Sequence, residues 1–78
     1  METFGTMARR WRGGLTQVEA SSKMGILQST ISKIETDSRR PSVRILYLMV
    51  EAYGISAEEL GDAVRLLGQL ETADEVDE

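Results

Sequence analysis

Four polar side chains recur at helical spacing in the segment QSTISKIE, namely Gln28, Ser29, Ser32 and Lys33. Residues four apart are neighbours on the surface of a helix, so these side chains lie on or near one exposed face. The amide of Gln28 offers a donor and an acceptor side by side, which suits the major-groove edge of adenine, and Lys33 can reach guanine acceptors or a phosphate. A helix over residues 28–35, roughly 10 to 12 Å across, would fit a major groove with its first side chains against the base edges.

The composition argues against catalysis and against a bound metal. The 78 residues include no histidine and no cysteine, so the commonest general base, the best nucleophile and two main types of metal ligand are missing. The serines do not form a G-x-S-x-G motif, and the carboxylates cluster near the C-terminus. We therefore expect a protein that is not an enzyme, with no cofactor and no metal site.

Charge is distributed unevenly along the chain. Residues 1–44 carry eight basic and four acidic side chains, a net charge of +4, whereas residues 45–78 carry one basic and nine acidic side chains, a net charge of −8. The asymmetry suggests one surface for an anionic partner and another that repels it, ending in the acidic stretch TADEVDE. The alternative is that both are ordinary solvated faces.

The length indicates one small domain. The apolar segments and the absence of cysteine indicate the compartment in which the protein resides. No stretch approaches the 18 to 20 apolar residues of a membrane span, and the N-terminal METFGTMARRWRGG has no apolar core of a signal peptide. The absence of cysteine fits a reducing compartment. We expect a cytoplasmic protein without membrane contact.

Helix signals dominate and predict an all-α fold of five helices. Their expected ranges are 3–12, 16–24, 28–35, 42–53 and 56–70, which make a domain of residues 1–70 followed by an acidic, flexible tail of residues 71–78. Two segments, Thr16-Gln17-Val18-Glu19 and Ser56-Ala57-Glu58-Glu59, match the capping box that opens a helix. Gly13-Gly14, Gly25 and Gly54 stand where helices should end.

Apolar spacing predicts the core faces of the helices. Met7, Met24 and Met49 are expected to fill the core rather than to bind a ligand. The spacing places inside Phe4, Met7, Ala8 and Trp11 of the first helix, Val43, Leu46, Met49, Val50 and Tyr53 of the fourth, and Leu60, Ala63, Val64 and Leu67 of the fifth. Leu66 and Leu70 are left on an adjoining stripe.

Two short helices around a glycine turn form a helix-turn-helix. The segment TQVEASSKMGILQSTISKIE resembles the Cro/repressor (XRE-type) family of DNA-binding regulators at nearly all of its twenty positions, and RRPSVRILYLMVEAYGIS is similar to that family's fourth and fifth helices. About residues 5–68 are covered, and the pattern IE-T-x-x-RRPS is similar to small regulators of actinomycetes, phages and plasmids. The resemblance implies a five-helix Cro/repressor-like domain that binds a specific double-stranded DNA operator and represses transcription by obstructing polymerase.

The resemblance also implies roles for single residues. Gln28 would contact a base, and Gln17 would hold the DNA backbone and brace Gln28. The start of the helix at Gln17 favours a phosphate oxygen, because its backbone N–H groups and dipole point outward. Thr16 and Thr30 are further hydroxyl donors.

The resemblance implies roles for two further arginines and for one ion pair. Arg39 and Arg40 would lie beside the DNA backbone or minor groove. Arg10 is expected to form a structural ion pair with Glu35 rather than to contact DNA.

The sequence departs from the family pattern at three positions. Leu27 stands where a serine or threonine usually caps the reading helix, so a cap of roughly 1 kcal/mol is missing. Ala20 replaces a usual leucine while Val50 is larger than the frequent alanine, and we expect the two to exchange volume across the core.

A single recognition helix, here residues 28–35, contacts too few base pairs to define a site that is rare in a genome. We therefore expect a homodimer on an inverted repeat. The fifth helix and the loop before it would form its interface. The first alternative is an antitoxin-like or anti-repressor module whose acidic C-terminal half binds a protein, with DNA binding secondary. The second is that these residues are one segment of a longer regulator that senses a ligand.

Overall fold

The first helix begins with a reciprocal cap and carries the aromatic part of the core. Thr3 accepts a hydrogen bond from the Thr6 backbone N–H, and the Thr6 hydroxyl accepts one from Thr3. Phe4 and Trp11 then meet edge to face with ring centroids 5.8 Å apart. The structure is a computed structural model that describes residues 2–76, with side chains up to residue 68.

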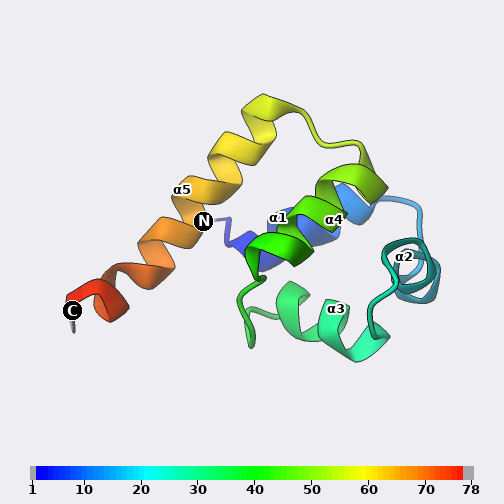
Figure 1. Ribbon diagram of the computed structural model, residues 1–78, viewed down its shortest axis with the longest axis horizontal. Helices are drawn as coiled ribbons and strands as arrows, with labels where there is room; N and C mark the ends of the chain where they lie inside the picture. The colour runs from blue at the N-terminus through cyan, green and yellow to red at the C-terminus, as the bar shows by residue number, and fades with distance from the viewer. Residues whose placement is uncertain (1, 77–78) are drawn as a thin grey trace.

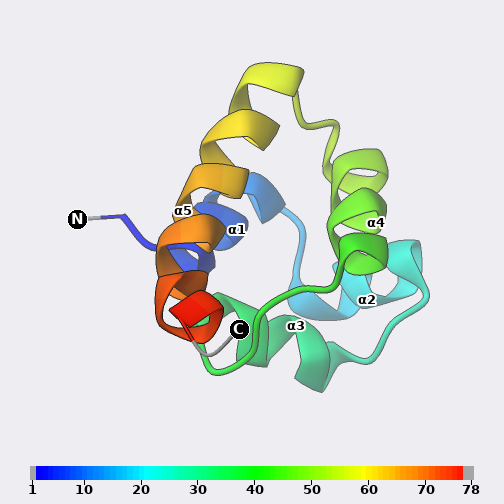
Figure 2. The same cartoon turned by 60° about the vertical axis from the view of Figure 1, so that its left-hand side comes forward.

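The described residues form five helices and no strand, which confirms the expected all-α fold. In Figure 1, α5 runs along one side of the molecule and continues past the other helices, while α2 and α3 lie at the lower right. Figure 2 shows α1 at the back, with α4 and α5 on either side and α3 across the lower end. The helices are α1 (Phe4–Arg12), α2 (Gln17–Met24), α3 (Gln28–Glu35), α4 (Val43–Tyr53) and α5 (Ala57–Val76).

The core joins all five helices around α1 and α3. Ile31, Ile34 and Met49 are completely buried, and Met7 and Met24 are also buried, so the expected role of these methionines is confirmed. Three glycines with positive φ end the first, second and fourth helices, as the sequence predicts.

The expected core face of α4 is partly wrong. Val43 is 87% exposed, whereas Ile45, outside the expected stripe, is buried beside Met49. Helix α4 is apolar on more than one side, so two stripes satisfy the 3.6-residue period. Contact with the other helices selects the stripe through Ile45 and Met49.

A similar correction applies to α5 and to the supposed volume exchange. Val64 is 54% exposed, while Leu66 packs against the core. Val50 lines a groove with Leu46 and Leu60 and is not among the side chains packed on the buried cluster that contains Ala20. The expected exchange between Ala20 and Val50 is therefore not seen.

Helix α5 is longer than expected. It continues to Val76, six residues past its predicted end at residue 70. The side chain of Leu70 and the last residues of the expected flexible tail, 77 and 78, lie outside what the structure describes. Within the described part of the chain, no helix has both the length and the apolar character to cross a membrane.

Candidate nucleic-acid interface

The exposed face of α3 begins at its first residue. Gln28, Ser29 and Lys33 are exposed and Ser32 is half-buried, so the four side chains share one side of the helix as their spacing predicts. Thr30 lies on the other side with only 8% of its surface exposed. Its hydroxyl therefore belongs to the packed side of α3, and the structure does not bring it to the face formed by the other four.

Two local devices shape α2 and the turn that leads into α3. Thr16 Oγ1 accepts from the Glu19 backbone N–H at 3.0 Å, and Glu19 Oε1 accepts from the Thr16 N–H at 2.8 Å, which is the predicted capping box. Gly25 takes the left-handed conformation at the end of α2, and Ser21 Oγ donates to the Ile26 carbonyl in the turn. The Thr16 hydroxyl accepts one bond here and keeps its own proton for another acceptor.

The start of α3 lacks a side-chain cap. Leu27 is the N-cap residue and is 72% exposed, with an extended backbone and no side-chain hydrogen bond. The missing cap expected from the sequence is therefore confirmed.

Gln28 is tied to the start of α2. Its Nε2 donates to Gln17 Oε1 at 3.3 Å, which is the contact that the resemblance implied. Gln17 in turn donates from Nε2 to Glu35 Oε1 at 3.0 Å. A chain of side-chain hydrogen bonds thus connects the first residue of α3 to its last.

The ion pair of Glu35 involves other arginines than expected. Arg12 donates from Nε to Oε2 at 2.7 Å and from Nη2 to Oε1 at 3.0 Å, and Arg9 Nε lies 3.8 Å from Oε1. Arg10 instead pairs with Glu2 and Glu59. The expected Arg10–Glu35 pair is wrong.

Helical spacing explains this difference. Gly5, Arg9 and Arg12 are four and three residues apart, so they share the side of α1 that faces the end of α3. Arg10 points to the other side, toward α5. The close approach of Gly5 to Glu35 turns this side of α1 toward α3. A Cβ on Gly5 would lie 2.5 Å from the Glu35 carbonyl oxygen.

Glu35 is ionised within this cluster. Its side chain is 1% exposed, and burial raises its pKa. The hydrogen bonds from Arg12 and Gln17 and the charges of Arg12 and Arg9 outweigh burial, so the pKa of Glu35 lies below its ordinary value. A carboxylate in this state is an acceptor only, which fixes the direction of every hydrogen bond that reaches it.

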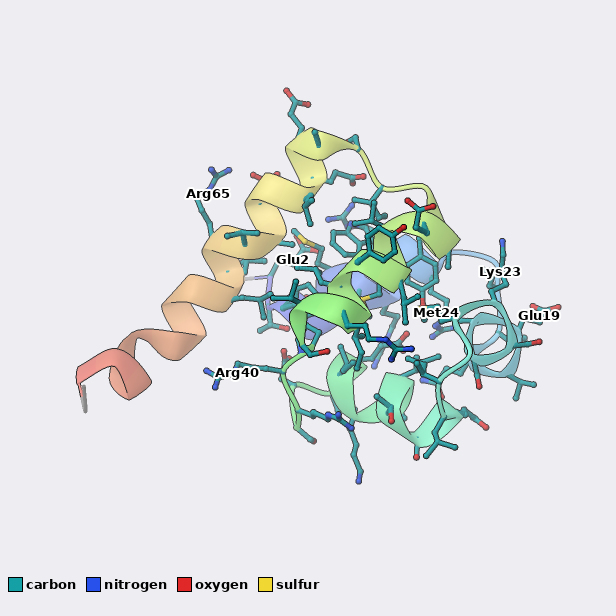
Figure 3. The ribbon with its side chains drawn as sticks, in the orientation of Figure 1. Glu2, Glu19, Lys23, Met24, Arg40 and Arg65 are labelled. Carbon is teal, nitrogen blue, oxygen red and sulfur yellow. The ribbon has the colours of Figure 1, made fainter. Side chains whose placement is uncertain are left out.

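The loop after α3 carries the two candidate arginines. Asp37, with φ of 63°, accepts from the Gly5 N–H at 2.9 Å and from Thr3 Oγ1 at 2.7 Å. This contact, which the sequence reading missed, anchors the loop to the start of α1. Arg39 and Arg40 are exposed, and Figure 3 shows Arg40 projecting outward from the loop.

The fold therefore gathers most of the sequence-predicted residues along one end of the molecule. Gln17, Gln28, Ser29, Ser32 and Lys33 lie on or against α3, and the loop bearing Arg39 and Arg40 starts at its C-terminal end. The backbone N–H groups of Ser38 and Arg39 donate to the Lys33 carbonyl at 2.8 and 3.3 Å. In Figure 3, Glu19 and Lys23 of α2 point away from this arrangement.

Comparison with known proteins identifies the fold. The helix-turn-helix family model matches residues 7–60, which is more than half of the chain. A protein described as the uncharacterized HTH-type transcriptional regulator y4dJ, from Sinorhizobium fredii, is 40% identical over 47 residues, 60% of this chain. The matched region spans 61% of that relative's length. No solved structure matches the chain.

The family match, the order of the five helices and the geometry of α2, its turn and α3 all indicate the same fold. The chain belongs to the helix-turn-helix family of the Cro/repressor (XRE) type.

Proposed function

We propose that the protein binds a specific double-stranded DNA site and regulates transcription in the cytoplasm, as a repressor that obstructs polymerase. Family membership and the name of the y4dJ relative support a DNA-binding regulator. The observation that carries the specific part is an exposed α3 whose first side chain, Gln28, is held by Gln17 at 3.3 Å. The proposed activity is recognition, without a catalytic step or a cofactor.

The proposed contacts divide into base readers and backbone contacts. Gln28 uses one N–H on Gln17, so its second N–H and its carbonyl remain to pair with adenine N7 and N6. Ser29, Ser32 and Lys33 follow along the groove. The DNA backbone is contacted by Thr16, Gln17, Arg39 and Arg40.

The protein acts as a homodimer in this proposal, through a surface other than the one expected from the sequence. Leu66 packs on the core, whereas Val43, Tyr47 and Val64 are exposed apolar side chains of α4 and α5 that a second copy could cover. Tyr47 also lines the apolar groove between α4 and α5. The interface therefore centres on α4 with the first turns of α5.

Charge supports a second copy as the partner on this surface. Arg44 and Glu51 are both exposed and lie seven residues apart on one side of α4, with Tyr47 between them. In a two-fold arrangement with antiparallel α4 helices, Arg44 of each copy would face Glu51 of the other. The two α3 helices would then read half-sites with centres about 34 Å, or about 10 base pairs, apart.

Selection of bound sites from random duplex DNA tests the proposed function. We expect an inverted repeat to be enriched. Gln28→Ala should lose discrimination at one base position by about 1 to 3 kcal/mol, whereas Gln17→Ala should weaken all sequences more evenly.

A charge-matched pair of variants controls this experiment. Lys33→Ala and Arg65→Ala each remove one positive charge, but Arg65 lies on α5 in an ion pair with Asp62, far from α3 in Figure 3. Only Lys33→Ala should weaken binding. If no duplex is enriched, the proposal fails in favour of the antitoxin-like or anti-repressor module.

Charge exchange tests the dimer. Arg44→Glu and Glu51→Arg should each weaken self-association and occupancy of the inverted repeat, and the double exchange should restore both, as measured by sedimentation velocity. Tyr47→Glu should give a folded monomer. A tight 1:1 complex on a non-palindromic site would contradict the dimer.

A further inference from the structure

The hydrogen-bond chain from Gln28 to Glu35 has a direction that a buried charge imposes. Because the ionised Glu35 can only accept, Gln17 must turn its amide nitrogen toward it, as the 3.0 Å contact shows. The Gln17 carbonyl then faces Gln28, which must turn its own nitrogen inward. Each amide orientation therefore follows from the one before it.

The outward-facing atoms of Gln28 are fixed in the same way. One N–H donates to Gln17, which leaves the carbonyl and the second N–H of this exposed side chain for another partner. This acceptor and donor match adenine, which offers the N6 donor and the N7 acceptor. If the amides of Gln17 and Gln28 were both turned by 180°, Gln28 would accept from Gln17 and present two N–H donors, which match the N7 and O6 acceptors of guanine.

We infer that Glu35, held by Arg12, is a positioning residue that sets the amide orientation of Gln28 through Gln17 and so favours adenine over guanine at the contacted base. The inference rests on the proposed DNA recognition by Gln28. Glu35 cannot make the contact itself, because its side chain is 1% exposed and its oxygens are occupied by Arg12 and Gln17. Its effect on specificity therefore passes through the two glutamines.

The positioning role of Glu35 can be distinguished from a purely structural role by the choice of variant. Arg12 and Glu35 bridge α1 and α3, so removing one of them alone leaves a buried unpaired charge and risks unfolding. Removing both at once avoids that penalty, because a buried ion pair can be replaced by apolar side chains of similar volume with little loss of stability. The variant Arg12→Met/Glu35→Met thus keeps the packing but deletes the acceptor that orients Gln17.

The experiment measures base preference at the position read by Gln28, with the four possible bases placed there in the selected operator. The wild type should prefer adenine. Arg12→Met/Glu35→Met should lose about fivefold or more of its adenine preference over guanine, with guanine gaining most among the other bases. Circular dichroism and urea unfolding establish that this variant is folded.

A second background tests whether the effect passes through Gln17. Gln17→Met keeps the length of the side chain and removes its amide. In that background, the Arg12→Met/Glu35→Met change should leave the adenine-to-guanine ratio unaltered, because the connection is already broken. An equal loss in both backgrounds would overturn the inference and assign Glu35 a purely structural role.

Arg12→Lys is the conservative control. It keeps a positive charge beside Glu35 but loses the paired geometry, so it should lower stability while retaining the adenine preference. A folded Arg12→Met/Glu35→Met variant with wild-type preference would also overturn the inference.

A measurement without DNA separates this inference from the proposed function. Side-chain NH₂ signals of Gln17 and Gln28 in NMR spectra of the free protein should both shift in Arg12→Met/Glu35→Met. Unchanged signals would overturn the relay even if the protein binds its operator. Failure to enrich any operator would instead remove the proposed function, and the specificity role with it, whatever the NMR spectra show.

Discussion

Glu35 is the residue on which the candidate interface depends most directly. It accepts hydrogen bonds from Arg12 and Gln17 while its side chain is almost completely buried. A charge in that position is stable only while its partners stay in place, because an unpaired buried charge is strongly destabilising. One carboxylate therefore joins α1, α2 and α3 into a single unit.

The first prediction concerns the pH dependence that Glu35 brings. Since the folded pKa of Glu35 lies below its ordinary value of 4.5, its contribution to stability is present above that value and is lost as the pH falls through the folded pKa. Glu35→Gln should therefore lower the free energy of unfolding at pH 7 by about 3 kcal/mol or more. The difference from wild type should shrink in acid.

Urea unfolding at neutral and acid pH measures this change. Asp62→Asn removes an exposed carboxylate whose partner Arg65 is also exposed, and it serves as the control with little change in stability at any pH. A Glu35→Gln defect of the same size at every pH would show that the lost stability does not come from the carboxylate charge.

At the scale of the helices, close approach and capping determine where α3 lies. Gly5 lets α1 approach the end of α3, and Asp37 extends this contact into the following loop. The N-cap at Leu27, in contrast, contributes no side-chain hydrogen bond. The C-terminal end of α3 is thus more firmly held than its N-terminal end.

The second prediction compares two helical glycines. In Gly5→Ala, the new Cβ would lie 2.5 Å from the Glu35 carbonyl oxygen and 2.8 Å from Asp37 Oδ2, so α1 and α3 must separate, with a loss of about 1 to 3 kcal/mol. A Cβ on Gly61 meets nothing within 4 Å, and Gly61→Ala should stabilise α5 by up to about 1 kcal/mol. Thermal unfolding of both variants should give shifts of opposite sign, and equal shifts would contradict the close approach.

The third prediction restores the missing cap. Leu27 already has the extended backbone of an N-cap residue, so Leu27→Ser can accept a hydrogen bond from the Ser29 N–H and should add about 1 kcal/mol of stability. Val18→Ser removes another exposed apolar side chain, 61% exposed within α2, without creating a cap. Chemical unfolding should show the gain only for Leu27→Ser, and a gain in both variants would mean that removal of apolar surface is the cause.

At the scale of the whole molecule, the distribution of charge and the direction of α5 affect the proposed binding of DNA. The candidate interface lies in the basic half of the chain, and the acidic half includes α5. Figure 1 and Figure 2 both place the C-terminal end of α5 at the height of α3. The C-terminal end of α5 therefore lies toward the same end of the molecule as the proposed DNA contacts.

The fourth prediction concerns truncation after residue 70, which removes Glu71, Asp74, Glu75, Asp77 and Glu78. Non-specific DNA affinity should rise, because these charges repel phosphates. For both forms, the logarithm of the association constant should fall linearly with the logarithm of the salt concentration. The slope should be about −0.9 per neutralised phosphate, despite the acidic overall charge. Fluorescence anisotropy over a salt series measures this, and unchanged or weaker binding after truncation would contradict the repulsion.

The sequence by itself determined the helix boundaries up to α4, the helix-turn-helix and the exposed face of α3. These features are local, because caps, glycines and the period of apolar residues act within a few neighbouring residues. The glycine ends at Gly25 and Gly54 and the Thr16 capping box were predicted for this reason, whereas the uncapped Leu27 was predicted from its departure from the family pattern.

Only the tertiary structure decided which side of each helix meets its neighbours. Arg12 rather than Arg10 pairs with Glu35, and Ile45 rather than Val43 enters the core. Each helix offered more than one side compatible with its sequence pattern, so the selection came from contacts between residues distant in the chain. The burial of Thr30 and the anchoring of Asp37 on α1 arise in the same way, because packing of α3 against α1 and α2 fixes its rotation.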